Sequence, residues 1–279
     1  MVLSHVKMSS YDFTKLSNFI YDEYGIKLTP VKKTMLESRL QKRLNALQMD
    51  SYKDYCDFVF STQGRQQELI HMIDLVTTNK TDFFREPAHF DFLTNQILPE
   101  FTSNTLIRPL KIWSAGCSSG EEPYTLAMVI NEFCESQQPI NYSISATDLS
   151  THVLNKAITA VYSEERVAGI PLQLKRKYFL KSKDPSKKTV RIVPYLRNRV
   201  SFGRLNFMDD SLDIASDFDI VFCRNVIIYF DKITQEKVIN KLCDKVKPGG
   251  YFFLGHSESI TGMQVPLEQL KPTVFKKIR

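Results

Sequence analysis

The feature that most constrains this fold is an alternation of short apolar runs with helical patterns, which begins after Arg108-Pro109. The runs LKIWSAG, YSISATD, FDIVFCRN and GGYFFLG are strand candidates, and FDIVFCRN is typical of a buried strand. Between them, apolar residues recur at helical spacing, as Leu126, Ile130 and Phe133 do. Strands that alternate with helices favour a parallel sheet covered by helices on both faces. We therefore predict an α/β domain in the second part of the chain.

The first part of the chain lacks these strand patterns and is predicted to be all α-helical. Apolar residues recur at helical spacing from Phe13 to Tyr24, and Thr29-Pro30 is a typical start of a second helix. We expect a helical N-terminal domain over residues 1–76 and the α/β domain over residues 77–279. Inside the second domain we expect a small β-rich insertion at about residues 175–204, where VRIV and RVSF look like short strands. The final TVFKKI is expected to form an edge strand.

Hydropathy and cysteine content exclude several classes of protein. No apolar stretch approaches the ~18 residues that a membrane helix needs, and the N-terminus has no apolar signal core. The five cysteines are widely spaced and form no CxxC pair, which argues against a disulfide scaffold and a standard zinc site. We therefore expect a cytoplasmic protein without membrane insertion and without a metal site.

Positive charge is concentrated in the predicted insertion. From Lys175 to Arg204 there are eleven Lys and Arg residues against one acid, Asp184, in a chain of net charge +6. A local basic surface favours an acidic partner such as nucleic acid, anionic lipid or an acidic protein. The alternative is a solvated face with no partner.

Four strand ends are expected to carry the ligand site, because ligands of open parallel α/β sheets bind beyond the carboxyl ends of the strands. The first is SAGCSSGEEPY, where Gly116 and Gly120 permit a tight turn before a helix N-terminus that can bind an anion. Its spacing is not GxGxxG, which argues against a dinucleotide. At the second, Asp148 either accepts hydrogen bonds from ribose hydroxyls or caps the next helix. The other two ends are marked by Asn206 and by Cys223-Arg224-Asn225.

Six motifs together give the chain a family resemblance. They are, in chain order, TTNKTDFFRE, WSAGCSSGEEPYTLA, ATDLS, LNF, FCRNVIIYFD and KPGGYFFLGHSES. With them the chain resembles the chemoreceptor glutamate methyltransferases, the CheR family, over nearly its whole length. The resemblance implies a Rossmann-like methyltransferase sheet with a β insertion, preceded by a helical domain. It also implies S-adenosylmethionine as cofactor, S-adenosylhomocysteine as product, and methyl transfer to glutamates on the cytoplasmic helices of chemotaxis receptors, for adaptation in chemotaxis signalling.

The resemblance carries site residues onto this chain, motif by motif. For the cofactor pocket it implies Asn79, Thr81, Arg85, Glu122, Asp148, Asn206, Phe207, Arg224 and Asn225. Nearest the transferred methyl group it implies Arg85 and Tyr229. One departure is visible, because family members that dock on a receptor's C-terminal pentapeptide carry a glycine-rich turn in the insertion, and LKSKDPSKKT has no glycine. Pentapeptide tethering is therefore not implied for this chain.

The implied chemistry needs no nucleophile and general-base pair, and the sequence has no obvious one. A glutamate carboxylate is ionised at pH 7 and can attack a methyl electrophile directly. Tyr229 can place its ring near the sulfonium, a contact worth roughly 0.5–2 kcal/mol. Arg85 can orient the substrate carboxylate or hold the cofactor's own carboxylate, and the sequence leaves both roles open.

A cationic stripe is predicted on the second helix of the N-terminal domain. At about 100° per residue, Lys32, Arg39 and Arg43 share one face of that helix. Beside them runs an apolar stripe of Leu36, Leu40, Leu44 and Leu47. We expect the cationic stripe and the basic insertion to dock an acidic receptor helix. The alternative is a solvated helix face.

Two other functions remain open from the sequence. One is a nucleic-acid-binding methyltransferase or binding module that uses the basic insertion, for which salt-dependent binding is the diagnostic. The other is a sensor that binds the cofactor without turnover, against which the presence of Arg85 and Tyr229 argues. Our expectation is a monomeric enzyme that is recruited to receptor arrays at the membrane and has no nucleic acid as partner.

Overall fold

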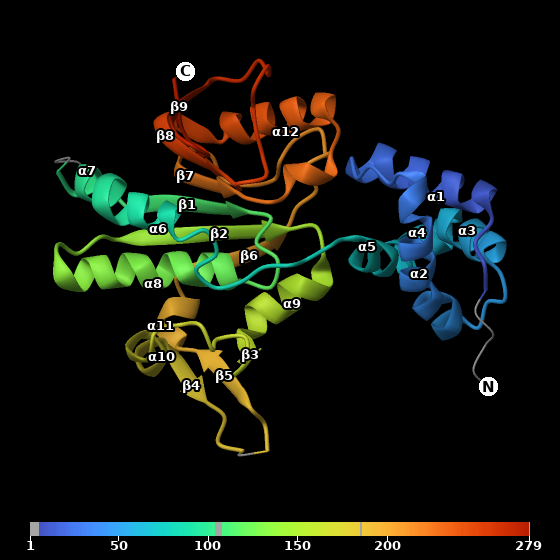
Figure 1. Ribbon diagram of the computed structural model, residues 1–279, viewed down its shortest axis with the longest axis horizontal. Coiled ribbons are helices and arrows are strands. Elements are labelled where there is room, and N and C mark those ends of the chain that lie inside the picture. The colour runs from blue at the N-terminus through green and yellow to red at the C-terminus, as the bar shows by residue number, and fades with distance from the viewer. Residues whose placement is uncertain (1–5, 104–107, 185, 279) are drawn as a thin grey trace.

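The computed structural model describes residues 6–103, 108–184 and 186–278, and its centre is a seven-stranded sheet of order β6-β2-β1-β7-β8-β10-β9 (Figure 1). The strands are β1 (Leu110–Ala115), β2 (Tyr142–Asp148), β6 (Val200–Arg204), β7 (Phe218–Cys223), β8 (Val246–Leu254), β9 (Leu267–Lys271) and β10 (Val274–Lys277). The five strands from β6 to β8 run parallel, and β10 and β9 continue the sheet antiparallel. The predicted α/β fold is therefore confirmed.

Alternate residues of the central strands face two separate cores, one on each side of the sheet. Ile112 and Phe222 belong to the core under α8 (Glu121–Ser136), whereas Trp113 and Val221 belong to the core under α12 (Lys232–Asp244). The two helices accordingly lie on opposite faces of the sheet (Figure 1). Strands buried on both faces need apolar residues at successive positions, which explains the continuous apolar runs in the sequence. The first face is also covered by α6 (Ala88–Phe92), the π-helical turn η2 (Leu93–Ile97), α7 (Leu98–Ser103) and α9 (Thr151–Thr159).

The N-terminal helices form a bundle with a core of its own beside the sheet (Figure 1). They are α1 (Ser10–Tyr24), the 3-10 turn η1 (Pro30–Lys32), α2 (Lys33–Leu47), α3 (Tyr52–Phe60), α4 (Thr62–Gln67) and α5 (Leu69–Val76). Leu36, Leu40 and Leu44 are fully buried, as the apolar stripe predicts, while Leu47 is only partly buried. Pro30 opens η1 rather than α2, so Lys32 precedes the helix on which we expected it.

The β-rich insertion has other borders than the expected residues 175–204. A separate three-stranded sheet of order β3-β5-β4 begins earlier, with β3 (Val161–Ser163), and continues through β4 (Phe179–Lys181) and β5 (Thr189–Ile192). Two short helices, α10 (Leu172–Tyr178) and α11 (Pro194–Arg197), accompany it. The RVSF run is β6, which pairs with β2 in the large sheet. A three-residue strand such as β3 is too short to show a periodicity in the sequence.

The expectation of a C-terminal edge strand was also wrong in position. TVFKKI forms β10, which lies between β8 and β9, so β9 is the edge. β9 has an almost fully exposed LEQLK sequence, and this lack of an apolar pattern concealed it. None of the helices in the described ranges is both long enough and apolar enough to span a bilayer.

Candidate active site

An open cavity lies beyond the carboxyl ends of the parallel strands. Ligands of open parallel α/β sheets bind at this place. All ten residues proposed for the cofactor pocket and the methyl position line it, namely Asn79, Thr81, Arg85, Glu122, Asp148, Asn206, Phe207, Arg224, Asn225 and Tyr229. The structure thus brings together residues from five separate motifs at one place.

Asp148 organises the turn that follows β1. Gly116 and Gly120 both have positive φ, which glycine adopts without steric cost. The Asp148 carboxylate accepts from the Ser118 N–H at 2.8 Å and from the Ser150 N–H at 2.9 Å. Burial raises the pKa of this carboxyl, and those two amides oppose the rise. The cap of α9 is Ser150, whose hydroxyl accepts from Val153, so Asp148 is not the helix cap. A carboxylate has about four acceptor sites, and Asp148 therefore keeps capacity for a ligand.

Glu122 and Arg224 form a buried ion pair between the ends of β1 and β7. Arg224 Nε lies 2.7 Å from Glu122 Oε2, and the Ser114 hydroxyl donates to Glu122 Oε1 at 2.6 Å. The guanidinium also packs 5.3 Å and 5.6 Å from the ring centroids of Phe90 and Phe222. Each charge therefore has its partner beside the cavity, and the attraction between the two offsets part of the cost of burying them.

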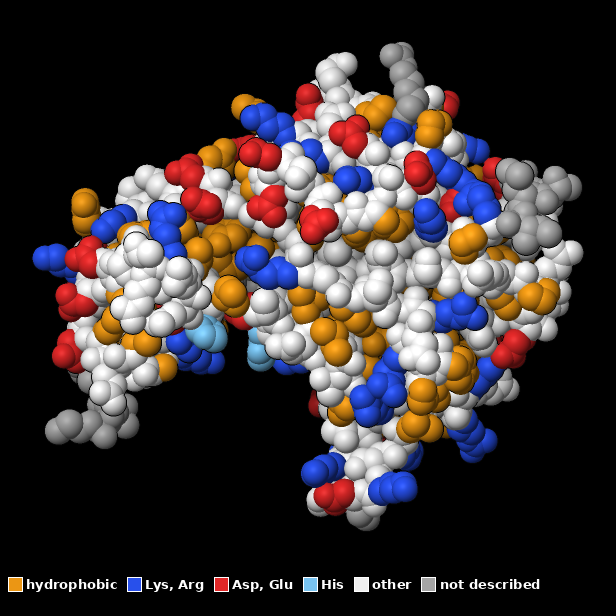
Figure 2. All heavy atoms as spheres, turned by 180° about the vertical axis from the view of Figure 1, so that it is seen from behind, with side chains coloured by type: hydrophobic (Ala, Val, Ile, Leu, Met, Phe, Trp, Pro, Cys, Tyr) orange, Lys and Arg blue, Asp and Glu red, His pale blue; other side chains and the backbone are white. Residues whose placement is uncertain are grey.

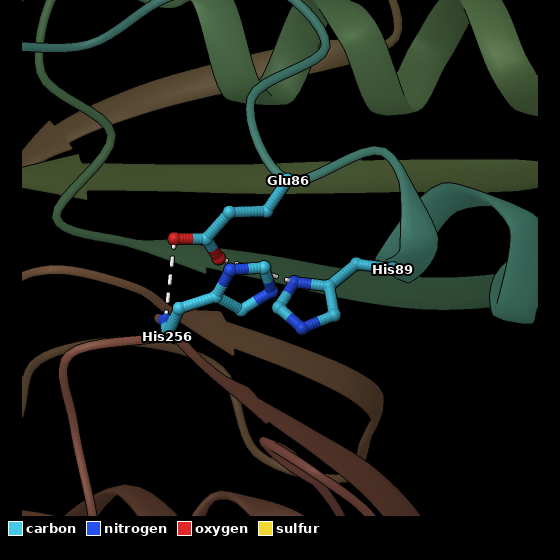
Figure 3. Close-up of side chains that lie close together, drawn as sticks. All are labelled: Glu86, His89 and His256. Atoms are coloured by element: carbon cyan, nitrogen blue, oxygen red, sulfur yellow. Dashed lines mark hydrogen bonds and ion pairs between the residues drawn. The ribbon is translucent and has the colours of Figure 1, made fainter.

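Behind this pair, Glu86, His89 and His256 point toward one another (Figure 3). Such a set of ligand types can hold a metal ion, and one oxygen of the Glu86 carboxylate, Oε2, has no hydrogen-bond partner among the described residues. Arg224 Nη1, however, lies 3.5 Å from that oxygen and 3.2 Å from His89 Nδ1. Burial and the Arg224 charge lower the pKa of His89 to about 4, so the imidazole is neutral at pH 7. The Arg224 guanidinium already supplies a cation to this cluster.

Arg85 and Tyr229 come from distant segments and meet at the cavity wall. Arg85 donates to the Lys80 carbonyl at 3.1 Å, and the Tyr229 hydroxyl donates to the Thr78 carbonyl at 3.3 Å. Burial raises the pKa of Tyr229, and the Arg85 and Arg39 charges offset part of that rise. Both neighbours of Arg85, Phe84 and Glu86, have left-handed backbone conformations. Such conformations cost energy in residues other than glycine and are often found at functional sites.

Two residues of the N-terminal bundle also line the cavity. Tyr24 ends α1 and was expected to be a core residue, and Ile26, which follows the helix, was not singled out by any pattern. The Lys27 N–H donates to the Tyr229 carbonyl at 2.9 Å, and the Asn206 side-chain amide donates to the Glu23 carbonyl at 2.9 Å. The only sequence signal was the apolar spacing of the helix, which gives Tyr24 a core role and says nothing of a second domain.

Glu258 was missed entirely, and it does not line the cavity itself. Its buried carboxylate accepts from four backbone amides at 2.7–2.9 Å. The donors are Gly255, Asn225, Val226 and Ile227. Asn225 has a left-handed conformation, and a side chain at Gly255 would collide with it. Glu258 therefore fixes the turn that carries Arg224, Asn225 and Tyr229.

The expected docking residues Lys32, Arg39 and Arg43 lie outside the cavity lining, and two of them are engaged within the bundle. Arg43 makes a two-pronged pair with buried Glu68 at 2.7 and 2.8 Å. Arg39 donates to the carbonyls of Leu75, Val76 and Thr77 at the end of α5, and to the Thr78 hydroxyl. A helical projection shows only residues of the same helix, so it could not predict these partners, which lie much further along the chain. Thr77 and Thr78 line the cavity, so this face of α2 lies beside it.

The basic insertion projects from the molecule, with blue side chains toward its tip (Figure 2). Part of its charge is balanced within the structure. Lys177 pairs with both Glu132 and Glu135 of α8, and Lys181 lies 3.4 Å from Glu164. The expected excess of positive charge is thus partly offset by acids outside the 175–204 stretch.

Comparison with known proteins assigns both domains. The CheR methyltransferase all-alpha domain matches residues 11–77, and the CheR methyltransferase SAM binding domain matches residues 79–276. A chemotaxis protein methyltransferase of Borreliella burgdorferi is 39% identical over 278 residues, covering 98% of this chain and 96% of the relative. One of Escherichia coli is 33% identical over 259 residues, covering 92% and 87%. The chain belongs to the CheR methyltransferase family and is an S-adenosylmethionine-dependent methyltransferase.

Proposed function

We propose that this protein methylates glutamate side chains on the cytoplasmic helices of chemotaxis receptors and thereby serves adaptation in chemotaxis signalling. The observation that carries the proposal is the convergence of all ten motif residues on one cavity, with Arg85 and Tyr229 on its wall. The products are a glutamate methyl ester and S-adenosylhomocysteine.

The cavity residues fit S-adenosylmethionine, which supplies an electrophilic methyl group on a sulfonium centre when it is bound. Asp148 retains acceptor capacity for ribose hydroxyls. The Tyr229 ring offers a π face for a cation, and Arg85 offers donors for a carboxylate. Glu122 and Arg224 neutralise each other and form a polar wall without net charge.

The chain's own residues then act by orientation and electrostatics. The acceptor carboxylate is ionised at pH 7, so the site needs no general base. Burial raises the pKa of Tyr229, so its hydroxyl stays protonated at pH 7. That hydroxyl donates to the Thr78 carbonyl. The aromatic ring is therefore held in place at the wall. Holding two reactants in a productive geometry is itself a large source of rate acceleration.

Substrate docking is proposed for the face of α2 that lies beside the cavity, together with the basic insertion. Within the described residues the Lys32 side chain makes no hydrogen bond or ion pair, whereas Arg39 and Arg43 also hold the bundle together. An acidic receptor helix suits this surface because opposite charges steer association. We further propose a cytoplasmic monomer that acts at receptor arrays.

The test is methyl transfer from tritiated S-adenosylmethionine to receptor-containing membranes, followed by treatment with base. Methyl esters release methanol in base, whereas methyl-lysine and methylated nucleic-acid bases do not. We expect label in the receptor band that is released as volatile methanol. Base-stable label, or label on nucleic acid, would contradict the proposal.

A further inference from the structure

Arg166 lies in the β-rich insertion, just after β3, and reaches back toward the cofactor cavity. Each of its guanidinium nitrogens contacts a different group outside the insertion. Nη2 donates to the Thr81 carbonyl, Nη1 lies 3.0 Å from Asp82 Oδ1, and Nε lies 3.2 Å from Glu121 Oε1. Thr81 lines the cavity, and Glu121 is the first residue of α8. One side chain therefore connects the insertion with two segments of the site.

The contact with Glu121 distinguishes Arg166 from an ordinary surface pair. Glu121 is buried, with 1% of its surface exposed, and its other carboxylate oxygen accepts from the Ser119 hydroxyl at 2.7 Å. The Arg166 side chain is partly exposed, but removing its charge would leave the buried Glu121 carboxylate without its cation, which is unfavourable. Without Arg166, Glu121 and the turn before it would have to rearrange. That turn includes Ser118, which lines the cavity.

Aromatic packing reinforces the same junction. The Phe83 ring packs edge-to-face against Tyr162 and Phe179 of the insertion, with centroid distances of 5.0 and 5.6 Å. The Tyr162 hydroxyl donates to the Ser119 carbonyl at 2.8 Å. The insertion thus contacts both the segment that contains Thr81 and the turn that contains Ser119.

We propose that Arg166 is a positioning residue for the cofactor cavity, and that the β-rich insertion sets the affinity for the cofactor through it. The inference goes beyond the proposed function, because it holds whichever acceptor is methylated. Because the loss of Arg166 also leaves buried Glu121 without its cation, cofactor affinity is measured on folded protein and separately from fold stability.

The first test is calorimetric binding of S-adenosylhomocysteine to the full-length chain. Arg166→Ala is expected to raise the dissociation constant about tenfold, within the usual range for coupling between sites. The matched control is Arg176→Ala, an exposed arginine of the same insertion, which is expected to leave it unchanged. Arg166→Lys keeps the charge but lacks the planar fork of donors, so an intermediate value is expected. Wild-type affinity in folded Arg166→Ala or Arg166→Lys would overturn the proposal.

A second test uses the wild-type protein and does not depend on any variant folding. Coupling between two sites is reciprocal, so S-adenosylhomocysteine should stabilise the insertion. Amide hydrogen exchange in peptides covering residues 161–170 is expected to slow on ligand addition, while exchange in α3 stays unchanged. If exchange slows at residues 79–83 but not at 161–170, the insertion is uncoupled from the cavity and the inference is wrong.

Discussion

Asp148 uses one carboxylate to hold the turn after β1 and to face the cavity, so its loss should weaken cofactor binding. We predict that Asp148→Ala raises the dissociation constant for S-adenosylhomocysteine by tenfold or more, since each lost hydrogen bond is worth about 0.5–3 kcal/mol. Calorimetry measures this directly. Asp213→Ala, at an exposed aspartate, is the control. Unchanged affinity in Asp148→Ala would remove Asp148 from the site.

His89 gives the protein a predictable acid sensitivity. Its folded pKa of about 4 lies below the ordinary value of 6.5, so the unfolded chain binds the proton more readily. Stability from neutral His89 is therefore fully present above pH 6.5 and is lost as the pH falls toward 4, by about 3 kcal/mol. Chemical unfolding of wild type and His89→Gln across this range measures the effect. Equal pH slopes in the two proteins would contradict it.

At the residue scale, the motifs predicted which side chains meet but not what supports them. Asp148 and Asn206 follow apolar strand runs, a local pattern that places them at one edge of a parallel sheet. Glu258 and Tyr24 have no such signal, because their partners lie in other segments of the chain. In addition, Glu258 binds only backbone amides, which every residue type except proline has, so no particular residue in the sequence points to it.

At the scale of single elements, the turn between β7 and α12 depends on Glu258. We predict that Glu258→Gln lowers methylation more than tenfold. The glutamine NH₂ group would face backbone N–H groups that donate hydrogen bonds to the carboxylate in the wild type, and two donors cannot bond to each other. Steady-state rates with saturating cofactor, together with the unfolding midpoint, separate this effect from lost stability. The matched control is Glu236→Gln on α12, outside the turn. Normal turnover by Glu258→Gln would show that the turn holds without the carboxylate.

Element type was predictable where burial imposes a pattern. The strands β1 and β7 are largely apolar because both faces of the sheet are covered there, and the positions of β1, β2, β7 and β8 followed from the sequence. The short β3 and the exposed β9 carry no such pattern, and strand order depends on pairing between distant segments. These facts explain the shifted insertion and the misplaced edge strand.

In the whole molecule, residues of the bundle and of the sheet domain line one cavity. The cationic residues of α2 and η1 differ in role, because Arg43 stabilises the bundle and Lys32 is proposed to dock the substrate. We predict that Arg43→Glu destabilises the bundle by about 3 kcal/mol, because buried Glu68 loses its cation and meets a second acid.

Lys32→Glu should leave stability unchanged and slow receptor methylation at low salt. Thermal unfolding and methylation assays at two salt concentrations measure both. Equal unfolding midpoints for Arg43→Glu and wild type would contradict the expected loss of stability. Methylation at the wild-type rate by Lys32→Glu in low salt would contradict the expected role in docking.

The joining of the two domains was not predictable from either one alone. Two hydrogen bonds join them: the Lys27 N–H donates to the Tyr229 carbonyl, and the Asn206 side chain donates to the Glu23 carbonyl. Both acceptors are backbone carbonyls, which every residue type has, so the sequence does not reveal them. Their effect is nevertheless specific, because they place Tyr24 and Ile26 on the cavity wall. The bundle therefore lines the cavity in addition to carrying the proposed docking surface.

We propose that receptor glutamates are methylated at this cavity, with Arg85 at its wall. The most direct measurement is mass-spectrometric mapping of methylated receptor peptides after reaction with wild type and with Arg85→Ala. We predict methyl esters on glutamate side chains of cytoplasmic receptor helices with wild type, and a loss of more than tenfold with folded Arg85→Ala. Methylation on another residue type, or equal methylation by both proteins, would contradict the account.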